Sequence, residues 1–278
     1  MKPLLRWTVG NANQQGLDIL AESTKRTTKA LGDQFDYVVC HNNTKPEDLE
    51  FLKANCVGVD FYKQNHMECS IPELRDESQF RYLIPNPKGI PAGSIWKMAP
   101  LRLRPNAHEI VIDNDVVIIS RHAKLEEFLA GDKMMLAGDK MPWYGRFAPL
   151  IGDRLFNSGV IGFPPGGNLH VSRLRRVWEG TGRLRNLLAN DEQGLLALTF
   201  GPTPHIYLDS STEMVELHKD GEVFFEGSFR METSRPYKFK GTEFGFHFVT
   251  ANRETPHLLW EEFREWAKAQ DQELATSI

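Results

Sequence analysis

The sequence predicts an α/β domain in which helices flank a mixed, mostly parallel sheet. Three observations support this prediction. Strand-like and helix-like segments alternate over the first 61 residues, which is typical of parallel strands joined by crossover helices. In the most strand-like stretch of the chain, two apolar β-branched runs flank Asp113-Asn114-Asp115. The 278 residues are enough for one large domain of this class, and no linker-like change of composition divides them.

The first half of the chain has short apolar runs that end at Gly10 or at polar clusters, as strands do. Between them lie amphipathic segments, one of which begins with Pro46, a residue suited to the first turn of a helix. A proline-rich, charged excursion at residues 70–93 interrupts the alternation. We expect strands at residues 4–9, 35–40, 57–61, 109–112 and 116–119, and helices at residues 15–31, 46–55, 95–103 and 121–130.

The second half continues with segments of both kinds. Residues 155–163 are strand-like on both sides of Asn157-Ser158-Gly159. The segment from Asp191 starts with acids, which suit a helix N-terminus, and the last segment has the apolar face of an amphipathic helix. We expect strands at residues 134–138, 155–163, 206–209, 224–229 and 244–249, and helices at residues 171–179, 191–198 and 254–270.

The composition excludes several classes of protein. With 33 basic and 37 acidic residues the net charge is −4, which argues against a nucleic-acid binder that relies on bulk positive charge. Three cysteines are too few for a disulfide framework, and the His66/Cys69 pair has no second pair at zinc-site spacing. No apolar run approaches the roughly 20 residues of a membrane span, and the N-terminal run is too short for a signal peptide. We therefore expect no nucleic-acid partner, no integral membrane segment and a cytoplasmic location.

Asp113-Asn114-Asp115 is the chemically most informative part of the sequence. Burying two carboxylates beside apolar strands is costly unless they are paired, and residues at positions i and i+2 of a strand point to the same side. Two converging carboxylates suit Mg²⁺ or Mn²⁺, and ligands gather at the carboxyl ends of strands in open α/β sheets. Asp and Asn are also common turn formers, so the triplet by itself fits either a metal site or a surface turn.

Four elements in order resemble nucleotide-sugar glycosyltransferases with the GT-A fold, and are similar to family-eight members. They are the Asp-x-Asp of residues 113–115, Leu155–Phe163 (LFNSGVIGF), Asn190-Asp191-Glu192-Gln193 followed by two leucines, and Phe246-His247-Phe248. The resemblance covers residues 4–265 in the order of these elements. It implies a single GT-A domain with a Rossmann-like sheet, a nucleotide-binding half at about residues 1–120 and an acceptor and metal-completing half at about 121–278.

The resemblance implies a metal-dependent glycosyltransferase. Such an enzyme moves a sugar from a nucleotide-diphosphate donor, here expected to be UDP-linked, to an acceptor hydroxyl, and similarity to family eight favours retention of the anomeric configuration. The implied metal ligands are Asp113, Asp115 and His247. Mn²⁺ is the expected ion and Mg²⁺ the alternative. The donor sugar, the acceptor and the oligomeric state are not set by the sequence.

The resemblance also implies residues around the donor and the reacting sugar. The implied catalytic residues are Asn157, Asp191, Glu192 and Gln193, and the sequence leaves open whether Asp191 or Glu192 is the functional acid. The implied nucleotide-sugar contacts are Asn11, Asn13, His41, Asn42, Lys97, Asn114, Ser158, Gly159 and Arg253. Residues 250–255 lack the Gly and the Pro-Trp that the family often has near Arg253. The aromatic pair Trp143-Tyr144 fits either an acceptor platform or a loop anchor.

Other classes share some of these features. A haloacid-dehalogenase-type phosphohydrolase also has an Asp-x-Asp after a strand, but usually near the start of the chain. A nucleotidyltransferase would carry a glycine-rich basic loop after the first strand, whereas residues 10–13 read Gly-Asn-Ala-Asn. A non-catalytic nucleotide-sugar binding protein of the same fold is the third alternative.

Overall fold

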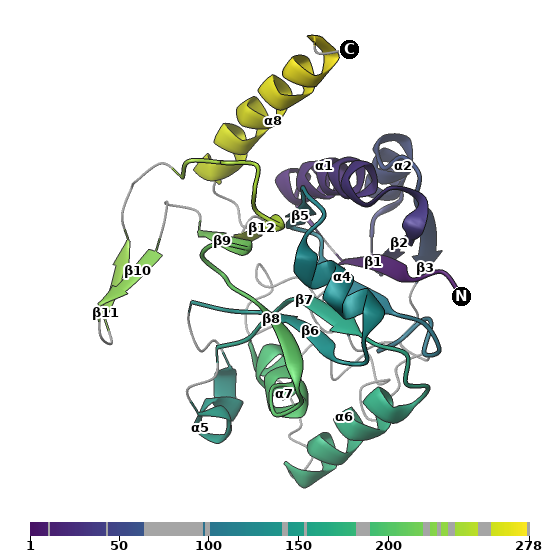
Figure 1. Cartoon of the computed structure of the whole chain (residues 1–278), viewed down its shortest axis with the longest axis vertical. Helices are drawn as coiled ribbons and strands as arrows, with labels where there is room; N and C mark the ends of the chain where they lie inside the picture. The colour runs from purple at the N-terminus through teal and green to yellow at the C-terminus, as the bar shows by residue number, and fades with distance from the viewer. Residues whose placement is uncertain are drawn as a thin grey trace.

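The computed structural model shows an α/β protein with one large and one small sheet in its body (Figure 1). It describes residues 1–10, 12–42, 44–63, 97, 101–140, 144–152, 155–181, 190–218, 223–226, 229–232, 237–249 and 257–276. The expected excursion at residues 70–93 and most of the expected helix at 95–103 lie outside these residues. In the described part, no helix is both long and apolar enough to cross a membrane.

The large sheet has the strand order β3-β2-β1-β4-β7-β6-β8. Its strands are β1 (Leu4–Val9), β2 (Asp36–His41), β3 (Asp60–Lys63), β4 (Glu109–Asp113), β6 (Met134–Ala137), β7 (Asn157–Phe163) and β8 (His205–Leu208). All neighbouring pairs are parallel except those made by β7, which runs antiparallel to β4 and to β6. Strand β7 therefore begins at the sheet edge where β4 ends.

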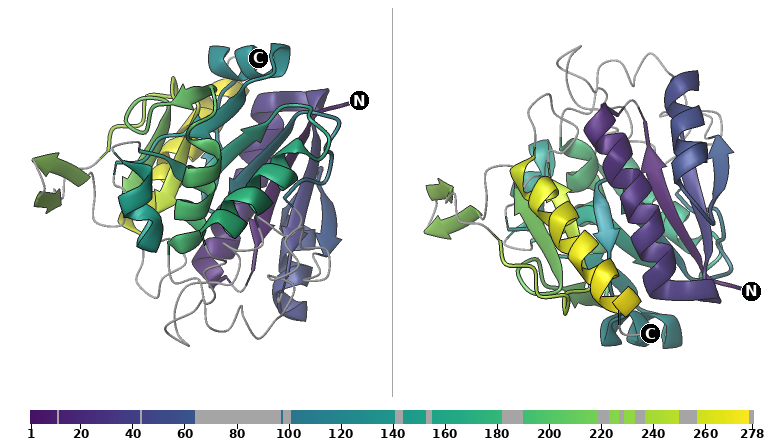
Figure 2. Two further views of the ribbon diagram at one scale, coloured as in Figure 1. Left: turned by 90° about the horizontal axis from the view of Figure 1, so that it is seen from below. Right: turned by 90° about the horizontal axis from the view of Figure 1, so that it is seen from above.

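Helices cover both faces of the large sheet (Figures 1 and 2), and a hydrophobic core lies on each face. Along β4, Val111 belongs to one core, and Ile110 and Ile112 belong to the other, as the alternation of a strand requires. The first core packs against α5 (Ala148–Ile151), α6 (Leu169–Gly180) and α7 (Asp191–Phe200), and the second against α1 (Gln14–Leu31), α2 (Pro46–Asn55) and α4 (Ala123–Ala130). Short 3₁₀ turns lie at Gly32–Gln34 and Gly145–Phe147.

A smaller sheet has the order β5-β12-β9, formed by β5 (Val116–Ile118), β12 (Gly245–Val249) and β9 (Met214–His218). A third core packs it against α1 and α8 (Leu258–Thr276), with Val117, Phe246 and Phe263 fully buried. The hairpin of β10 (Val223–Glu226) and β11 (Phe229–Glu232) lies apart from both sheets (Figure 1). Since β5 follows β4 after two residues, the two sheets meet at Asn114 and Asp115.

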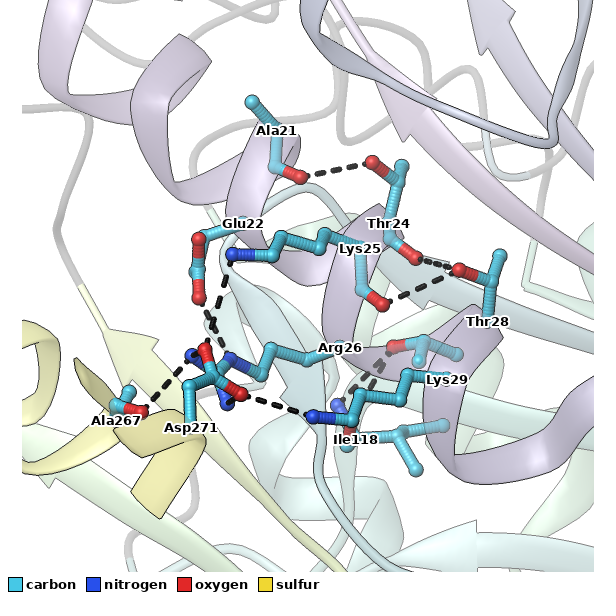
Figure 3. Close-up of polar contacts among 11 residues, drawn as sticks. Ala21, Glu22, Thr24, Lys25, Arg26, Thr28, Lys29, Ile118, Ala267 and Asp271 are labelled. Carbon is cyan, nitrogen blue, oxygen red and sulfur yellow. Dashed lines mark hydrogen bonds and ion pairs between the residues drawn. The ribbon is translucent and has the colours of Figure 1, made fainter. Parts of the chain in front are cut away.

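Helix α8 also docks on α1 through an ion cluster (Figure 3). Both Asp271 carboxylate oxygens accept from Arg26, at 3.2 and 2.6 Å, and Lys29 donates to one of them at 2.8 Å. Arg26 also donates to the Ala267 carbonyl at 3.1 Å. These bonds join the end of the chain to its first helix, and Figure 2 (right) shows the two helices side by side.

Most expected elements are present within a few residues, but three differ. Asn157-Ser158-Gly159 opens β7 instead of interrupting it. Residues 224–229 form parts of two strands, and the strand expected at 57–61 begins only at Asp60, after a turn at Gly58 with φ of 75°. Strand β9 and the short helix α5 were not predicted. Val215–His218 does alternate apolar and polar residues, but the alternation is only four residues long and its polar positions are buried too.

Candidate active site

The candidate site lies at the carboxyl edge of the large sheet. Val9 pairs with His41 and Thr8 pairs with Asp113, so β1, β2 and β4 end at one level. Antiparallel β7 places Val160 beside Ile112, so Gly159 is level with Asp113 and residues 157–158 extend past the end of β4 at this same edge. Chain direction thus gathers Asp113 and the expected Asn-Ser-Gly segment at the edge where open α/β sheets bind ligands.

Three potential metal ligands converge where the two sheets meet. Asp113 ends β4, Asp115 precedes β5, and His247 on β12 pairs with Val116. The His247 Nε2 atom lies 3.3 Å from Asp115 Oδ1 and 4.0 Å from Asp113 Oδ2. One ligand atom from each of the three residues falls within 4.8 Å of the others. The backbone fixes this arrangement, because the N–H of Phe248 donates to the Asp115 carbonyl at 2.9 Å.

The donor set fits a divalent cation. Two carboxylates and one imidazole suit Mn²⁺ or Mg²⁺, and within the described part of the chain neither a thiolate nor a second histidine joins the group. The ring of His247 lies close to Gly159, where an added Cβ would be 2.7 Å from its Cε1 and 2.9 Å from its Nδ1. A glycine at this position is therefore what lets the imidazole reach the carboxylates.

Electrostatic interactions in this cluster are strong because the side chains are buried. Burial opposes the charged imidazolium of His247, but the carboxylates of Asp115, Asp113 and Glu216 outweigh it and raise its pKa to about 9. Burial raises the pKa of Asp113, and the ammonium of Lys97 opposes that rise. The carboxylates of this cluster thus attract cations, and Lys97 and His247 balance part of their negative charge.

Lys97, which the resemblance implies as a donor contact, lies beside the potential metal ligands. Its ammonium lies 2.7 and 2.8 Å from the two carboxylate oxygens of Asp113, and only 4% of the residue is exposed. It also donates to the Ser158 hydroxyl at 3.0 Å and to the Ser158 carbonyl at 3.3 Å. Lys97 therefore bridges β4 and β7 beside the metal ligands.

A second cluster joins β7 to the start of α7. Asp139, 2% exposed, accepts from the Asn157 amide at 3.2 Å and from the Gln193 amide at 2.9 Å. The side-chain Oε1 of Gln193 accepts from the Ser158 hydroxyl at 3.3 Å, and the side-chain Oδ1 of Asn157 accepts from the Gly159 N–H at 2.6 Å. Both expected amide residues are thus held in fixed orientations next to Lys97.

The two acids left open by the sequence have different surroundings. Asp191 is fully buried and accepts from Arg146 through Nε at 2.9 Å, Nη2 at 2.7 Å and the backbone N–H at 2.8 Å. This ion pair ties α7 to the turn before α5. Glu192 is half-buried, burial raises its pKa, and Lys97 and Asp113 both act on it electrostatically. Asp191 is thus held by Arg146, whereas the charge of Glu192 interacts with Lys97 and Asp113.

The remaining expected donor contacts are spread along the edge. His41 and Asn42 are buried at the end of β2, where burial lowers the pKa of His41. Asn13 caps α1, its side-chain oxygen accepting from the Gly16 N–H at 2.9 Å. Asn114 lies half-buried in the turn between β4 and β5. Asn11, Trp143 and Arg253 fall outside the described residues.

Sequence reasoning missed two residues at this edge. Thr8 is buried beside Asp113, and its hydroxyl has no hydrogen-bond partner among the described residues. Asp139 holds the two amides described above. Asp113 was identified as a polar residue at the carboxyl end of an apolar strand. Thr8 and Asp139 fit the same rule. Tyr144 is fully buried and its hydroxyl accepts from the Phe156 N–H, so it anchors its loop.

No family model and no curated protein sequence matches the chain. Its structure is similar to solved glycosyltransferases. Galactosyltransferase LgtC, in complex with donor and acceptor sugar analogues, matches with a TM-score of 0.53 at 14% identity over 96% of this chain and 95% of that chain. The chain has the GT-A fold.

Two further structures agree with this fold. An active-site mutant of LgtC, in which a glutamine is replaced by glutamate, gives a TM-score of 0.52 at 14% identity over 89% of this chain and 87% of that chain. Mouse xyloside xylosyltransferase 1 gives 0.50 at 12% identity over 91% of this chain and 99% of that chain. At such low identity the similarity shows the fold, and the activity of a GT-A chain depends on the residues in its site.

Proposed function

We propose that this GT-A protein is a metal-dependent glycosyltransferase that moves a sugar from a nucleotide-diphosphate donor, with UDP-sugars as the first choice, to an acceptor hydroxyl. The observation that supports it is the convergence of Asp113, Asp115 and His247 at the carboxyl edge of the sheet. Retention of configuration belongs to the proposal, and so does a cytoplasmic location, since nucleotide sugars are made there.

In this proposal Asp113, Asp115 and His247 hold the cation, with Mn²⁺ preferred over Mg²⁺. When bound, the cation would offset the charge of the donor diphosphate and of the leaving nucleoside diphosphate. Lys97 adds a second positive charge at a fixed position, and its ammonium can exchange its bonds to Asp113 for bonds to a phosphate oxygen. The negative net charge of the chain is no obstacle, because the attraction is local.

The nucleoside is proposed to lie along the ends of β1 and β2, where Thr8, His41 and Asn42 offer polar groups. The Thr8 hydroxyl is the sharpest candidate, because it is buried without a protein partner among the described residues and burying it so is costly. Asn11, Asn13, Asn114 and Arg253 stay as expected contacts from the family resemblance.

The sugar is proposed to lie between Lys97 and the amide cluster. Each amide nitrogen of Asn157 and Gln193 has two N–H groups, and Asp139 accepts from each nitrogen, so both amides are oriented before a sugar arrives. A glutamine also belongs to the active site of LgtC, as its glutamate mutant indicates. We assign Gln193 and Asn157 to the sugar hydroxyls and Glu192 to the reacting centre.

The proposal is tested by donor hydrolysis, the slow reaction of a glycosyltransferase with water in place of its acceptor. UDP- and GDP-sugars are incubated with the protein with and without Mn²⁺, and nucleoside diphosphate release is measured. Release that needs Mn²⁺ and is lost in Asp113→Asn, while Asp132→Asn at an exposed site keeps it, supports the proposal. Release that persists in metal-free buffer, or from phosphate esters instead, would contradict it.

A further inference from the structure

A buried ion network joins β1, β4 and the chain before β4. Arg6 and Glu109 are fully buried, and Arg6 Nε donates to Glu109 Oε1 at 2.7 Å. Arg102, also buried, donates from Nε to Glu109 Oε2 at 3.3 Å. The same carboxylate accepts from the backbone N–H groups of Leu103 at 3.1 Å and Arg104 at 2.8 Å. One side chain of β4 thus fixes a stretch of backbone outside the sheet.

The two arginines of this network hold different segments. Arg6 Nη2 donates to the Leu101 carbonyl at 2.9 Å and lies 3.5 Å from the Lys97 carbonyl. Arg102 donates to the carbonyls of Pro164, at 3.1 Å, Arg104, at 2.9 Å, and Ala107, at 2.6 Å. Among the contacts of the described residues, Arg6 is therefore the arginine of this pair that reaches the backbone of Lys97, whose side chain enters the candidate site.

The network and the metal cluster occupy the two ends of one face of β4. Glu109, Val111 and Asp113 alternate along the strand, so their side chains lie on the same face over about 13 Å. Leu101 packs in the same core as Val111. Residues 102–104 are bound to the amino end of this face through Glu109. Lys97 is bound to its carboxyl end through the 2.7 Å contact with Asp113.

This geometry has a functional meaning beyond stability. A buried ion pair is often no more stabilising than apolar residues of similar size, so a buried arginine network is weak evidence for a role in stability alone. A lysine side chain is flexible, and its ammonium can be placed precisely only if its backbone is fixed. A guanidinium can hold a carboxylate and a carbonyl group at once because its donors form a rigid fork.

We propose that Arg6 is a positioning residue that holds the backbone of Lys97 and thereby keeps its ammonium against Asp113. The proposal rests on the proposed function only where it assigns Lys97 to the donor site. Arg6 itself lies in the sheet, and it acts through Lys97.

The first test uses the metal-free protein and needs no donor. The rate at which an amine-acylating reagent modifies Lys97 is followed by peptide mass spectrometry in the wild type, Arg6→Lys and Arg102→Lys. A lysine at position 6 keeps the positive charge but loses the fork, so modification of Lys97 should speed up about tenfold, as the loss of one charge-assisted hydrogen bond implies. Arg102→Lys weakens the same carboxylate contact and should leave the rate at the wild-type value. Equal rates in all three proteins, or equal acceleration in both variants, would overturn the proposal.

The second test is a double-mutant cycle on UDP affinity with Mn²⁺ present. Arg6→Lys should weaken UDP binding about tenfold on the same grounds, and it should add nothing in a Lys97→Met background. Additive losses would show that Arg6 acts on the fold and not through Lys97. If UDP binding depends on neither Mn²⁺ nor Lys97, the proposed function fails. The acylation rates then still decide whether Arg6 holds Lys97 in place.

Folding of the variants is checked by thermal melting. If Arg6→Lys does not fold, Arg6→Met is used in its place, because Glu109 then keeps its bonds to Arg102 and to the backbone N–H groups of Leu103 and Arg104. Faster acylation of Lys97 is expected in this variant as well. A wild-type rate there would overturn the proposal.

Discussion

The Nε2 atom of His247 lies 3.3 Å from Oδ1 of Asp115, although the two residues are far apart in the sequence. Two neighbouring strands of the small sheet bring them together: β5 begins just after Asp115, and β12 pairs His247 with Val116. The closeness follows from strand register and not from a loop. The candidate metal site is consequently part of the rigid frame of the protein.

Metal affinity should depend steeply on pH. In the metal-free protein the carboxylates around His247 raise its pKa to about 9, so its imidazole is protonated at neutral pH and must lose the proton to bind a metal. Below this pKa protons compete with the metal, and Mn²⁺ affinity should rise about tenfold per pH unit towards pH 9 and then level off. Calorimetry in buffers of different ionisation enthalpy should show release of about one proton per Mn²⁺ bound near neutral pH. Affinity that is flat from pH 6.5 to 8.5 would contradict this.

Gly159→Ala should disturb the metal site without unfolding the protein. A Cβ at this position would come within 2.7 Å of the His247 ring and 2.8 Å of Asn157 Oδ1, so the imidazole would have to shift from its place beside the carboxylates. We expect Mn²⁺ affinity to fall about 10–100-fold, the usual range when the orientation of a ligand is lost. Gly180→Ala is the matched control, because an added Cβ there meets no atom within 4 Å. Unchanged affinity in Gly159→Ala would mean that His247 is not a ligand.

We expect Asp191 to contribute to the stability of the protein and Glu192 to contribute to the reaction. Asp191→Asn weakens the ion pair that the buried Asp191 makes with the partly exposed Arg146, and it should lower the free energy of unfolding by about 1–2 kcal/mol, as the loss of charge-assisted hydrogen bonds to a solvated partner implies. Glu192→Gln should leave stability nearly unchanged and lower the donor hydrolysis rate. Urea unfolding and hydrolysis assays on both variants measure this. The reverse pattern would assign the chemistry to Asp191.

Asp271→Asn should loosen the docking of the last helix without affecting the site. Asp271 neutralises Arg26 and Lys29 at the contact shown in Figure 3. Since this cluster is partly exposed, its loss should reduce the free energy of unfolding by about 1 kcal/mol, and the effect should shrink at high salt. Glu265→Gln at an exposed pair on the same helix should change nothing measurable. No difference between the two variants in urea unfolding would show that Asp271 contributes nothing to docking.

The sequence was informative where local chemistry dominates. The apolar run before Asp113 predicted the strand that ends there, and the polar residues after it marked this end as a candidate site. The contact of Lys97 with Asp113 was not predicted, because it joins two segments that are separate in the sequence. It could not show that Asp191 faces Arg146 while Gln193 faces Asp139, because both follow from how α7 packs on its neighbours. Strand β9 escaped prediction because the burial of Glu216 depends on partners distant in the sequence, such as the Lys140 N–H at 3.0 Å.

The central claim is that Asp113, Asp115 and His247 hold a cation that binds the donor diphosphate. Titrating UDP into the protein with and without Mn²⁺, in the wild type and in Asp115→Ala, tests it most directly. We predict that Mn²⁺ strengthens UDP binding in the wild type and that this gain disappears in Asp115→Ala, while the melting temperature of the metal-free protein shows that the variant is folded. An Asp115→Ala variant that keeps the full Mn²⁺-dependent gain in UDP affinity would contradict the account.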